Sequence, residues 1–161
     1  MSDTPFKITF RFARPEDTQY FYNLMLAEKK KVPKQLGLYG FDRDIFSMDN
    51  YKGVFVALRN EEAVAYGRVI STTVSGFNYI ALFYVIPKYR RQGIGSKLFN
   101  FLEEYAFTNW NAKGVEIITI DNPIMDKLVK KRGFSLSGIY KKNLFVNGKW
   151  YNQSRWYKLY K

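Results

Sequence analysis

The stretch that decides the fold is VIPKYRRQGIGS, which occupies residues 85–96. The residues leading into it, 79–86, are apolar and rich in aromatic and β-branched side chains, which predicts a buried strand. After it, apolar residues recur at helical spacing from Ile94 to Tyr105, which predicts an amphipathic helix. A strand therefore leads through a glycine-containing loop directly into a helix N-terminus.

This loop has the properties of an anion-binding site. The first N–H groups of a helix lack intrahelical partners and lie at the positive end of its dipole. Gly93 and Gly95 have no Cβ, so a ligand can approach the main chain closely, and Arg90 and Arg91 add positive charge. We therefore expect the loop to bind a phosphate or pyrophosphate.

Two common phosphate motifs do not match this loop. The P-loop needs Lys and then Ser or Thr after its last glycine, whereas Gly95 is followed by Ser96 and Lys97. The dinucleotide fingerprint needs a third glycine, and position 98 is a leucine.

The composition limits the available chemistry. The chain has 161 residues, which suits a single domain over residues 1–161, and it contains neither cysteine nor histidine. Disulfides, thiolate metal sites, a cysteine nucleophile and a histidine base are therefore excluded, and we expect no metal site. The first fifteen residues carry dispersed charges and no unbroken apolar run, so we expect a soluble, cytoplasmic protein without a membrane span.

The net charge is +12, from 26 Lys and Arg against 14 Asp and Glu. Such a charge attracts polyanions, including nucleic acid, acidic proteins and phosphate-rich cofactors. The alternative is that the basic surface serves only solubility and cofactor steering.

The remaining pattern alternates strands and helices. Strands are predicted at residues 7–13, 53–59, 63–72, 115–120, 139–146 and 149–160, with hairpin turns at Asn60-Glu61-Glu62 and Asn147-Gly148. Further helices are predicted from Pro15 to the lysine run at Lys29–Lys34, at 42–51 and at 124–131.

Two motif blocks carry a family resemblance. The pattern Arg90-x-x-Gly93-x-Gly95, after Val85-x-Pro87, resembles the acetyl-coenzyme A signature of the GCN5-related N-acetyltransferase (GNAT) superfamily. In that family the strand after the long helix ends in an Asn, followed eleven residues later by Gly-Phe, as Asn122 and Gly133-Phe134 are here. The element order also agrees, so the resemblance covers nearly the whole chain. It implies an α+β fold with α/β/α layers: a mixed, mostly antiparallel twisted sheet of about seven strands, with about four helices.

The resemblance also implies a cofactor, acetyl-coenzyme A (acetyl-CoA). In the family the loop amides hold the pyrophosphate, and the preceding strand pairs through its main chain with the pantetheine arm. The implied cofactor-binding residues are Phe83, Tyr84, Val85, Arg90, Arg91, Gln92, Gly93, Ile94, Gly95, Ser96 and Asn122. For Asn122 the alternative is a turn before Pro123. A main-chain N–H at or near Val85 is the implied oxyanion donor.

The proton-transfer groups are less well defined. An amine that attacks a thioester must be neutral and about 3–3.5 Å from the carbonyl carbon. Because the strand at 79–86 has no carboxylate, the base must lie elsewhere, and we predict Asp121, at the end of the next strand. Glu116 lies at the far end of that strand. Capping of the following helix is the alternative role for Asp121. Tyr84 and Tyr140 are candidate acids, although with 13 tyrosines a packing role is the alternative for either.

Details of the motifs indicate a branch of the family. Many members have a tyrosine acid four residues before the glycine of Gly-Phe, where this chain has Val129. Tyr105-Ala106-Phe107, Gly138 and Asn147-Gly148 resemble the branch of ribosomal-protein N-terminal and spermidine acetyltransferases.

The predicted function is therefore acetyl-CoA-dependent N-acetylation of a primary amine, on a protein N-terminus or a polyamine, by direct attack, in a monomer or homodimer. One alternative is an amine carried on nucleic acid, such as an aminoacyl-tRNA, since Lys29–Lys34 lies where the family's acceptor loop falls. The other is a non-catalytic acyl-CoA-binding regulator.

Overall fold

The computed structural model describes residues 6–31, 53–71, 76–109, 112–146 and 148–160. The short helix predicted at 42–51 lies outside these residues, as does the second half of the lysine run at Lys29–Lys34.

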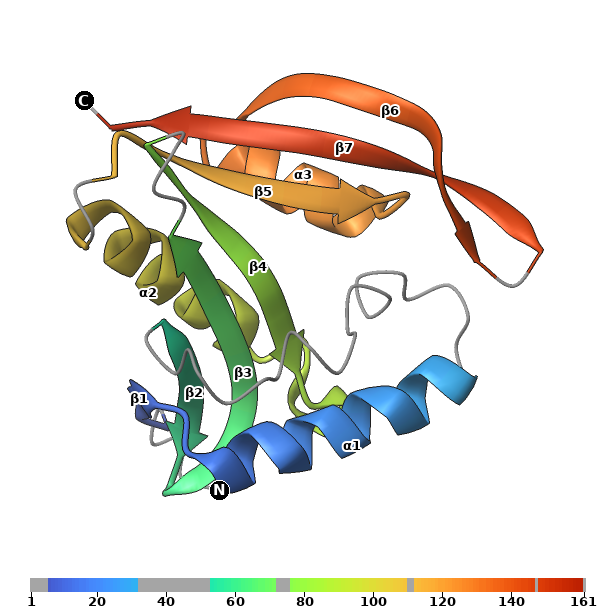
Figure 1. Cartoon of the computed structure of the whole chain (residues 1–161). Coiled ribbons are helices and arrows are strands. Elements are labelled where there is room, and N and C mark those ends of the chain that lie inside the picture. The colour runs from blue at the N-terminus through green and yellow to red at the C-terminus, as the bar shows by residue number, and fades with distance from the viewer. Residues whose placement is uncertain (1–5, 32–52, 72–75, 110–111, 147, 161) are drawn as a thin grey trace.

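One sheet of seven strands runs through the molecule, in the order β1-β2-β3-β4-β5-β7-β6 (Figure 1). All neighbouring pairs are antiparallel except β4 and β5, which are parallel. This confirms the predicted mixed, mostly antiparallel sheet. The strands are β1 (Ile8–Phe12), β2 (Val54–Arg59), β3 (Glu62–Ser71), β4 (Phe77–Val85), β5 (Gly114–Ile120), β6 (Ser135–Val146) and β7 (Lys149–Leu159).

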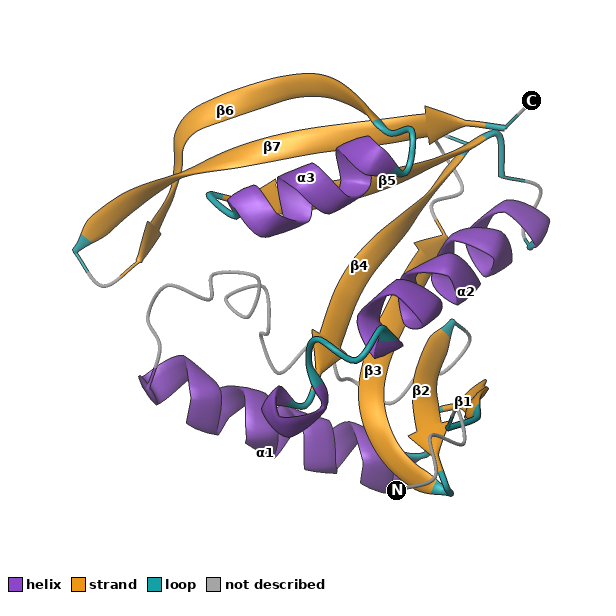
Figure 2. Cartoon of the chain, turned by 180° about the vertical axis from the view of Figure 1, so that it is seen from behind, coloured by secondary structure: helices purple, strands orange, loops and turns teal. Residues whose placement is uncertain are grey.

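Helices lie on both faces of the sheet. Helix α1 (Pro15–Lys31) lies on one face, and α2 (Ile94–Thr108) and α3 (Pro123–Lys131) lie on the other, as Figures 1 and 2 show from opposite sides. A short 3₁₀ helix, η3 (Pro87–Tyr89), lies in the connection between β4 and α2. The predicted α/β/α layers are therefore confirmed. No helix of the described residues has the length and apolar character needed to cross a membrane.

Each face has its own buried cluster. Under α2 and α3 the core includes Leu98, Phe99, Leu102, Val129 and Trp156. Under α1 it includes Phe21, Met25, Val56, Tyr66 and Tyr84. Because α1 and α2 pack on opposite faces of β3 and β4, these two strands are buried on both sides.

Helix α1 reaches Lys31, which lies within the lysine run where the sequence prediction ends it. One element boundary differs by several residues from the sequence prediction. Strand β6 begins at Ser135 rather than Ile139, because Ser135 and Leu136 pair with Tyr157 and Trp156 of β7. Cross-strand pairing overrides the weak strand propensity of the serine- and glycine-containing segment there.

The start of α1 is fixed by a buried carboxylate. Asp17 Oδ2 accepts the backbone N–H of Arg14 at 2.7 Å, and the Arg11 guanidinium donates to both Asp17 oxygens, at 2.6 and 3.1 Å. Burial by itself disfavours the ionised carboxylate, but the hydrogen bonds from Arg11 and Arg14 outweigh it and lower the pKa of Asp17. The helix is thereby tied to β1.

We expect Asp17→Asn to destabilise the protein at pH 7 by about 1.5–3 kcal/mol, the range for hydrogen bonds to charged groups. The pKa of Asp17 in the folded protein lies below the unfolded value of about 3.9. The stabilisation is therefore present above that value and is lost as the pH falls through the folded-state pKa. Urea unfolding of the wild type and Asp17→Asn at pH 7 and pH 3 gives the difference in their free energies of unfolding, with the exposed Glu16→Gln as the control. A difference of the same size at both pH values would contradict the prediction.

Candidate functional site

The site is built around a gap between β4 and β5. The two strands pair only from Phe77 opposite Gly114 to Ile80 opposite Ile117, and they diverge beyond these residues (Figure 1). At the same point the register of β4 with β3 shifts, so that Ile80 pairs with Val69 and Leu82 with Arg68. The extra residue is a β-bulge, which bends the strand.

Past the bulge, the edge of β4 that faces the gap keeps free main-chain groups. The N–H of Ile86 donates to the carbonyl of Val64 in β3 at 3.0 Å. Because hydrogen-bonding direction alternates along an antiparallel strand, the N–H groups of Phe83 and Val85 point away from β3 and toward the gap. The sequence analysis predicted main-chain contacts at these two residues.

The loop after β4 ends in an uncapped helix. Gly93 is the N-cap of α2, with φ 76°, and no side chain of the described residues caps it. The first intrahelical bond runs from Lys97 N–H to the Gly93 carbonyl, at 3.1 Å, so the N–H groups of residues 94–96 make no bond within the helix. A Cβ on Gly93 would meet no atom within 4 Å, which leaves the main chain open to a ligand.

The second glycine has a different role. A Cβ on Gly95 would lie 3.4 Å from the Phe83 ring and 3.6 Å from the Val85 side chain. Gly95 thus lets the first turn of α2 pack tightly on β4, which places the helix N-terminus beside the gap.

The side chain of Gln92 shapes the same loop. Its amide nitrogen donates to the Lys88 carbonyl at 3.1 Å, and its oxygen accepts from Arg59 at 2.8 Å. Arg91 is exposed and has φ 61°, an unusual conformation for a residue with a side chain.

Arg90 lies in the loop but is engaged on its inner side. Its Nη1 and Nη2 lie 2.8 and 3.0 Å from the two carboxylate oxygens of Glu28 in α1, and its Nε donates to the Val85 carbonyl at 2.9 Å. The Tyr84 hydroxyl donates to the same carboxylate at 2.6 Å. Burial and the Glu28 carboxylate raise the pKa of Tyr84, so this hydroxyl stays protonated at neutral pH. The geometry makes Arg90 a positioning residue that connects α1, β4 and the loop.

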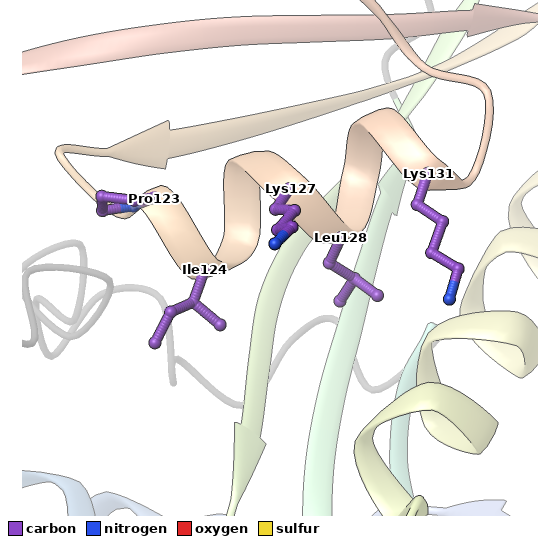
Figure 3. A pocket seen from close by; sticks show the side chains of 5 residues that line it. All are labelled: Pro123, Ile124, Lys127, Leu128 and Lys131. Carbon is purple, nitrogen blue, oxygen red and sulfur yellow. The ribbon is translucent and has the colours of Figure 1, made fainter.

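A hollow of about 460 Å³ lies along α3. It is lined by Pro123, Ile124, Lys127, Leu128 and Lys131. Figure 3 shows that Ile124, Leu128 and Lys131 project from the edge of α3 that faces α2. The sequence analysis missed this surface, although the spacing of 124, 128 and 131 on a helix could have indicated it, and Ile124 is 82% exposed.

The other predicted residues lie on β6 and at the end of β5. Asp121, at φ 38°, follows β5, and its Oδ2 accepts the N–H of Asn152 at 2.8 Å. Tyr140 is 48% exposed on β6, and the Arg155 guanidinium lies 5.0 Å from the centre of its ring. Asn122 Oδ1 accepts the N–H of Met125 at 3.1 Å, which is the N-cap of α3. The catalytic roles of Asp121 and Tyr140 stay predictions.

These features fit coenzyme A. A pyrophosphate suits the uncapped start of α2, and an extended amide-containing arm suits the unpaired edge of β4. The hollow on α3 adds an apolar surface with two lysines, Lys127 and Lys131.

Comparison with known proteins agrees with this interpretation. A family model described as Acetyltransferase (GNAT) family matches residues 18–134. No curated protein matches the sequence.

Solved structures with the same fold cover almost the whole chain. A spermidine N-acetyltransferase from Vibrio cholerae, in complex with CoA and spermine, is 18% identical with a TM-score of 0.77, over 94% of this chain and 95% of that one. An N-acetyltransferase from Staphylococcus aureus Mu50 is 16% identical with a TM-score of 0.77, over 95% and 98%. NAA60 from Arabidopsis thaliana, with a bisubstrate analogue, is 17% identical with a TM-score of 0.74, over 95% and 98%.

We expect Gly93→Glu to abolish acetyl-CoA binding, because it places a side chain and a negative charge where the pyrophosphate is expected. Gly148→Glu is the matched control, since Gly148 also has φ 76° and open space around its Cβ but lies in the β6–β7 turn. Calorimetric titration of both variants measures the affinity. Wild-type affinity in the Gly93→Glu protein would show that the anion site lies elsewhere.

Arg90→Ala should weaken acetyl-CoA binding by roughly 10-fold to 150-fold, the equivalent of about 1.5–3 kcal/mol. If Arg90 acts by positioning the loop, Glu28→Gln weakens binding in the same direction, and the double variant loses little more than Arg90→Ala alone. Tighter binding by Glu28→Gln would mean instead that Arg90 contacts the phosphates directly and that Glu28 competes for it. The exposed Glu61→Gln is the control.

Proposed function

The chain belongs to the acetyltransferase (GNAT) family, N-acetyltransferases that use acetyl-CoA, and from that premise we propose that it acetylates a primary amine by direct attack on the thioester. The observation that carries the proposal is the unpaired edge of β4, which leads at one end into the uncapped N-terminus of α2.

The proposed roles in cofactor binding are assigned from the positions of the main-chain N–H groups and the lysines. The N–H groups of residues 94–96 bind the pyrophosphate, and Lys127 and Lys131 add positive charge along α3. The free N–H groups of Phe83 and Val85 hold the arm of the cofactor, and the one at Val85 stabilises the oxyanion. When bound, acetyl-CoA supplies the activated acetyl group.

The acid for the leaving thiol does not come from the usual position. Val129 has no proton to donate and is fully buried in the core under α3. Tyr140 or a water molecule is the proposed donor, since the Tyr84 hydroxyl already donates its proton to a hydrogen bond with Glu28. Of the two tyrosines, Tyr140 is exposed and Tyr84 is buried.

Similar structures support an amine acceptor. One of them is a spermidine acetyltransferase whose structure contains spermine, and another is an N-terminal acetyltransferase bound to a bisubstrate analogue. We therefore propose a polyamine or a protein N-terminus as the acceptor. The net charge of +12 favours a second candidate, an amine carried on nucleic acid.

We expect wild-type protein to release free thiol from acetyl-CoA when a primary amine is added, and Gly93→Glu to release none. A panel of monoamines, diamines, polyamines, peptides and aminoacyl-tRNA, read by thiol release and mass spectrometry of the product, identifies the acceptor class. A steep loss of acceptor affinity with added salt would favour the nucleic-acid candidate. Tight acetyl-CoA binding without thiol release for any amine would contradict the proposed function.

A further inference from the structure

The face of the sheet that carries α1 is covered unevenly. Helix α1 packs over β2, β3 and β4, where its Phe21 and Met25 join a buried cluster. In Figure 1 no described helix lies in front of β5 and β7 on this face. Ile118 of β5 is 36% exposed there. No described helix therefore covers the surface beside the closed end of the gap between β4 and β5; this surface is called the open surface below.

Glu116 projects onto this open surface. Ile117 and Thr119 are buried on the opposite face, where the Thr119 hydroxyl donates to Asp126 of α3. Because side chains alternate along a strand, Glu116 and Ile118 point to the α1 face. The last pair between β4 and β5 is Ile80 with Ile117, so Glu116 lies one residue before the strands separate. Asp121, in contrast, lies at the open end.

Two tyrosines stand opposite Glu116 on the neighbouring strands. In register, Glu116 pairs with Tyr79 of β4 on one side and with Tyr157 of β7 on the other. Neighbouring strands lie about 4.7–4.9 Å apart, so the side chains of paired residues on one face of the sheet are within reach of each other. A carboxylate between two aromatic rings is the arrangement that favours an ammonium ion, through charge and cation–π attraction.

The carboxylate has no cationic partner among the described residues. Its Oε2 is buried, and no described residue makes a hydrogen bond to it. Arg155 lies on the same face, opposite Ile118, but its guanidinium leans away over the Tyr140 ring. Buried polar atoms are nearly always paired in proteins, so this oxygen of the half-buried Glu116 side chain points to a partner outside the described chain.

We propose that Glu116, Tyr79 and Tyr157 form an ammonium subsite, and that the acceptor is an aliphatic diamine or polyamine. This inference rests on the proposed function. One amine of the acceptor reacts in the gap, beside the free N–H groups of β4, while a second, charged amine binds Glu116. Val85, whose N–H is the proposed oxyanion donor, lies six residues along β4 from Tyr79, and a strand advances about 3.3 Å per residue. The two amines must therefore be separated by a chain long enough to span several residues of strand.

The experiment compares monoamines with diamines of increasing length, in wild type and Glu116→Gln. In the wild type we expect KM to fall as the diamine lengthens. In Glu116→Gln we expect KM for long diamines to rise roughly 10-fold to 150-fold and the length dependence to disappear. KM and kcat for a monoamine should stay unchanged. Calorimetric binding of a diamine to protein saturated with free coenzyme A should weaken by the same factor, which measures the subsite without turnover.

Controls separate binding from folding and from chemistry. The exposed Glu104→Gln should behave as wild type, and Glu116→Gln should have a Tm no lower than wild type, because it removes a half-buried charge whose Oε2 has no hydrogen-bond partner among the described residues. Tyr157→Phe should keep the preference for diamines, and Tyr157→Leu should reduce it.

Equal losses for monoamines and diamines, or no loss for either, would overturn the subsite. A wild-type protein that acetylates peptides or aminoacyl-tRNA but no diamine would overturn the subsite and leave N-acetylation intact. A wild-type protein that acetylates no amine would contradict the proposed function itself.

Discussion

The separation of β4 from β5 is the constraint on which the rest of the structure depends. These are the two parallel neighbours in the sheet, and they pair over only the four positions from Phe77 to Ile80. A longer ladder would consume the N–H groups of Phe83 and Val85 and leave nothing for an extended ligand to pair with. The bulge after Ile80 bends β4 away, and Gly95 lets α2 follow the bent strand closely. Strand, gap and helix N-terminus are therefore one unit.

A bent strand with an unpaired edge needs support from its other neighbours, and Glu28 contributes to it. Its carboxylate joins the Tyr84 hydroxyl and the Arg90 guanidinium, and Arg90 in turn holds the carbonyl of Val85. Three elements thus meet at one buried carboxylate: α1, the end of β4 and the loop that follows it. Since the Arg90 charge is matched by Glu28, we expect the attraction for phosphate to fall mainly on the main-chain N–H groups of α2 and on Lys127 and Lys131.

The strand, the glycine loop and the helix start of this candidate site could be predicted from local sequence. Gly93, Gly95 and the two elements around them lie within one short stretch, so residue spacing and the conformational freedom of glycine were enough to predict this backbone arrangement. The role of Arg90 could not be found in this way, because Glu28 is 62 residues distant in sequence. Glu116 was placed at the far end of β5 from the expected base, but only the pairing of Tyr79 with Glu116 shows that this end is where the strands part. Helix capping, by contrast, was expected as the alternative role of Asp121, and it is the neighbouring Asn122 that caps α3.

The electrostatics of the chain act at two scales, and they favour different ligands. A net charge of +12 favours polyanions over distances comparable with the screening length, about 8–10 Å, and brings a phosphate-rich cofactor to the surface. At shorter range the field depends on individual groups, and Glu116 presents a carboxylate between two rings on the open face of β5. A cationic acceptor is therefore repelled by the net charge of the molecule and attracted by the Glu116 carboxylate. Because salt screens the long-range repulsion more strongly than the contact with a partly buried carboxylate, added salt disfavours a nucleic-acid acceptor and is tolerated by a polyamine.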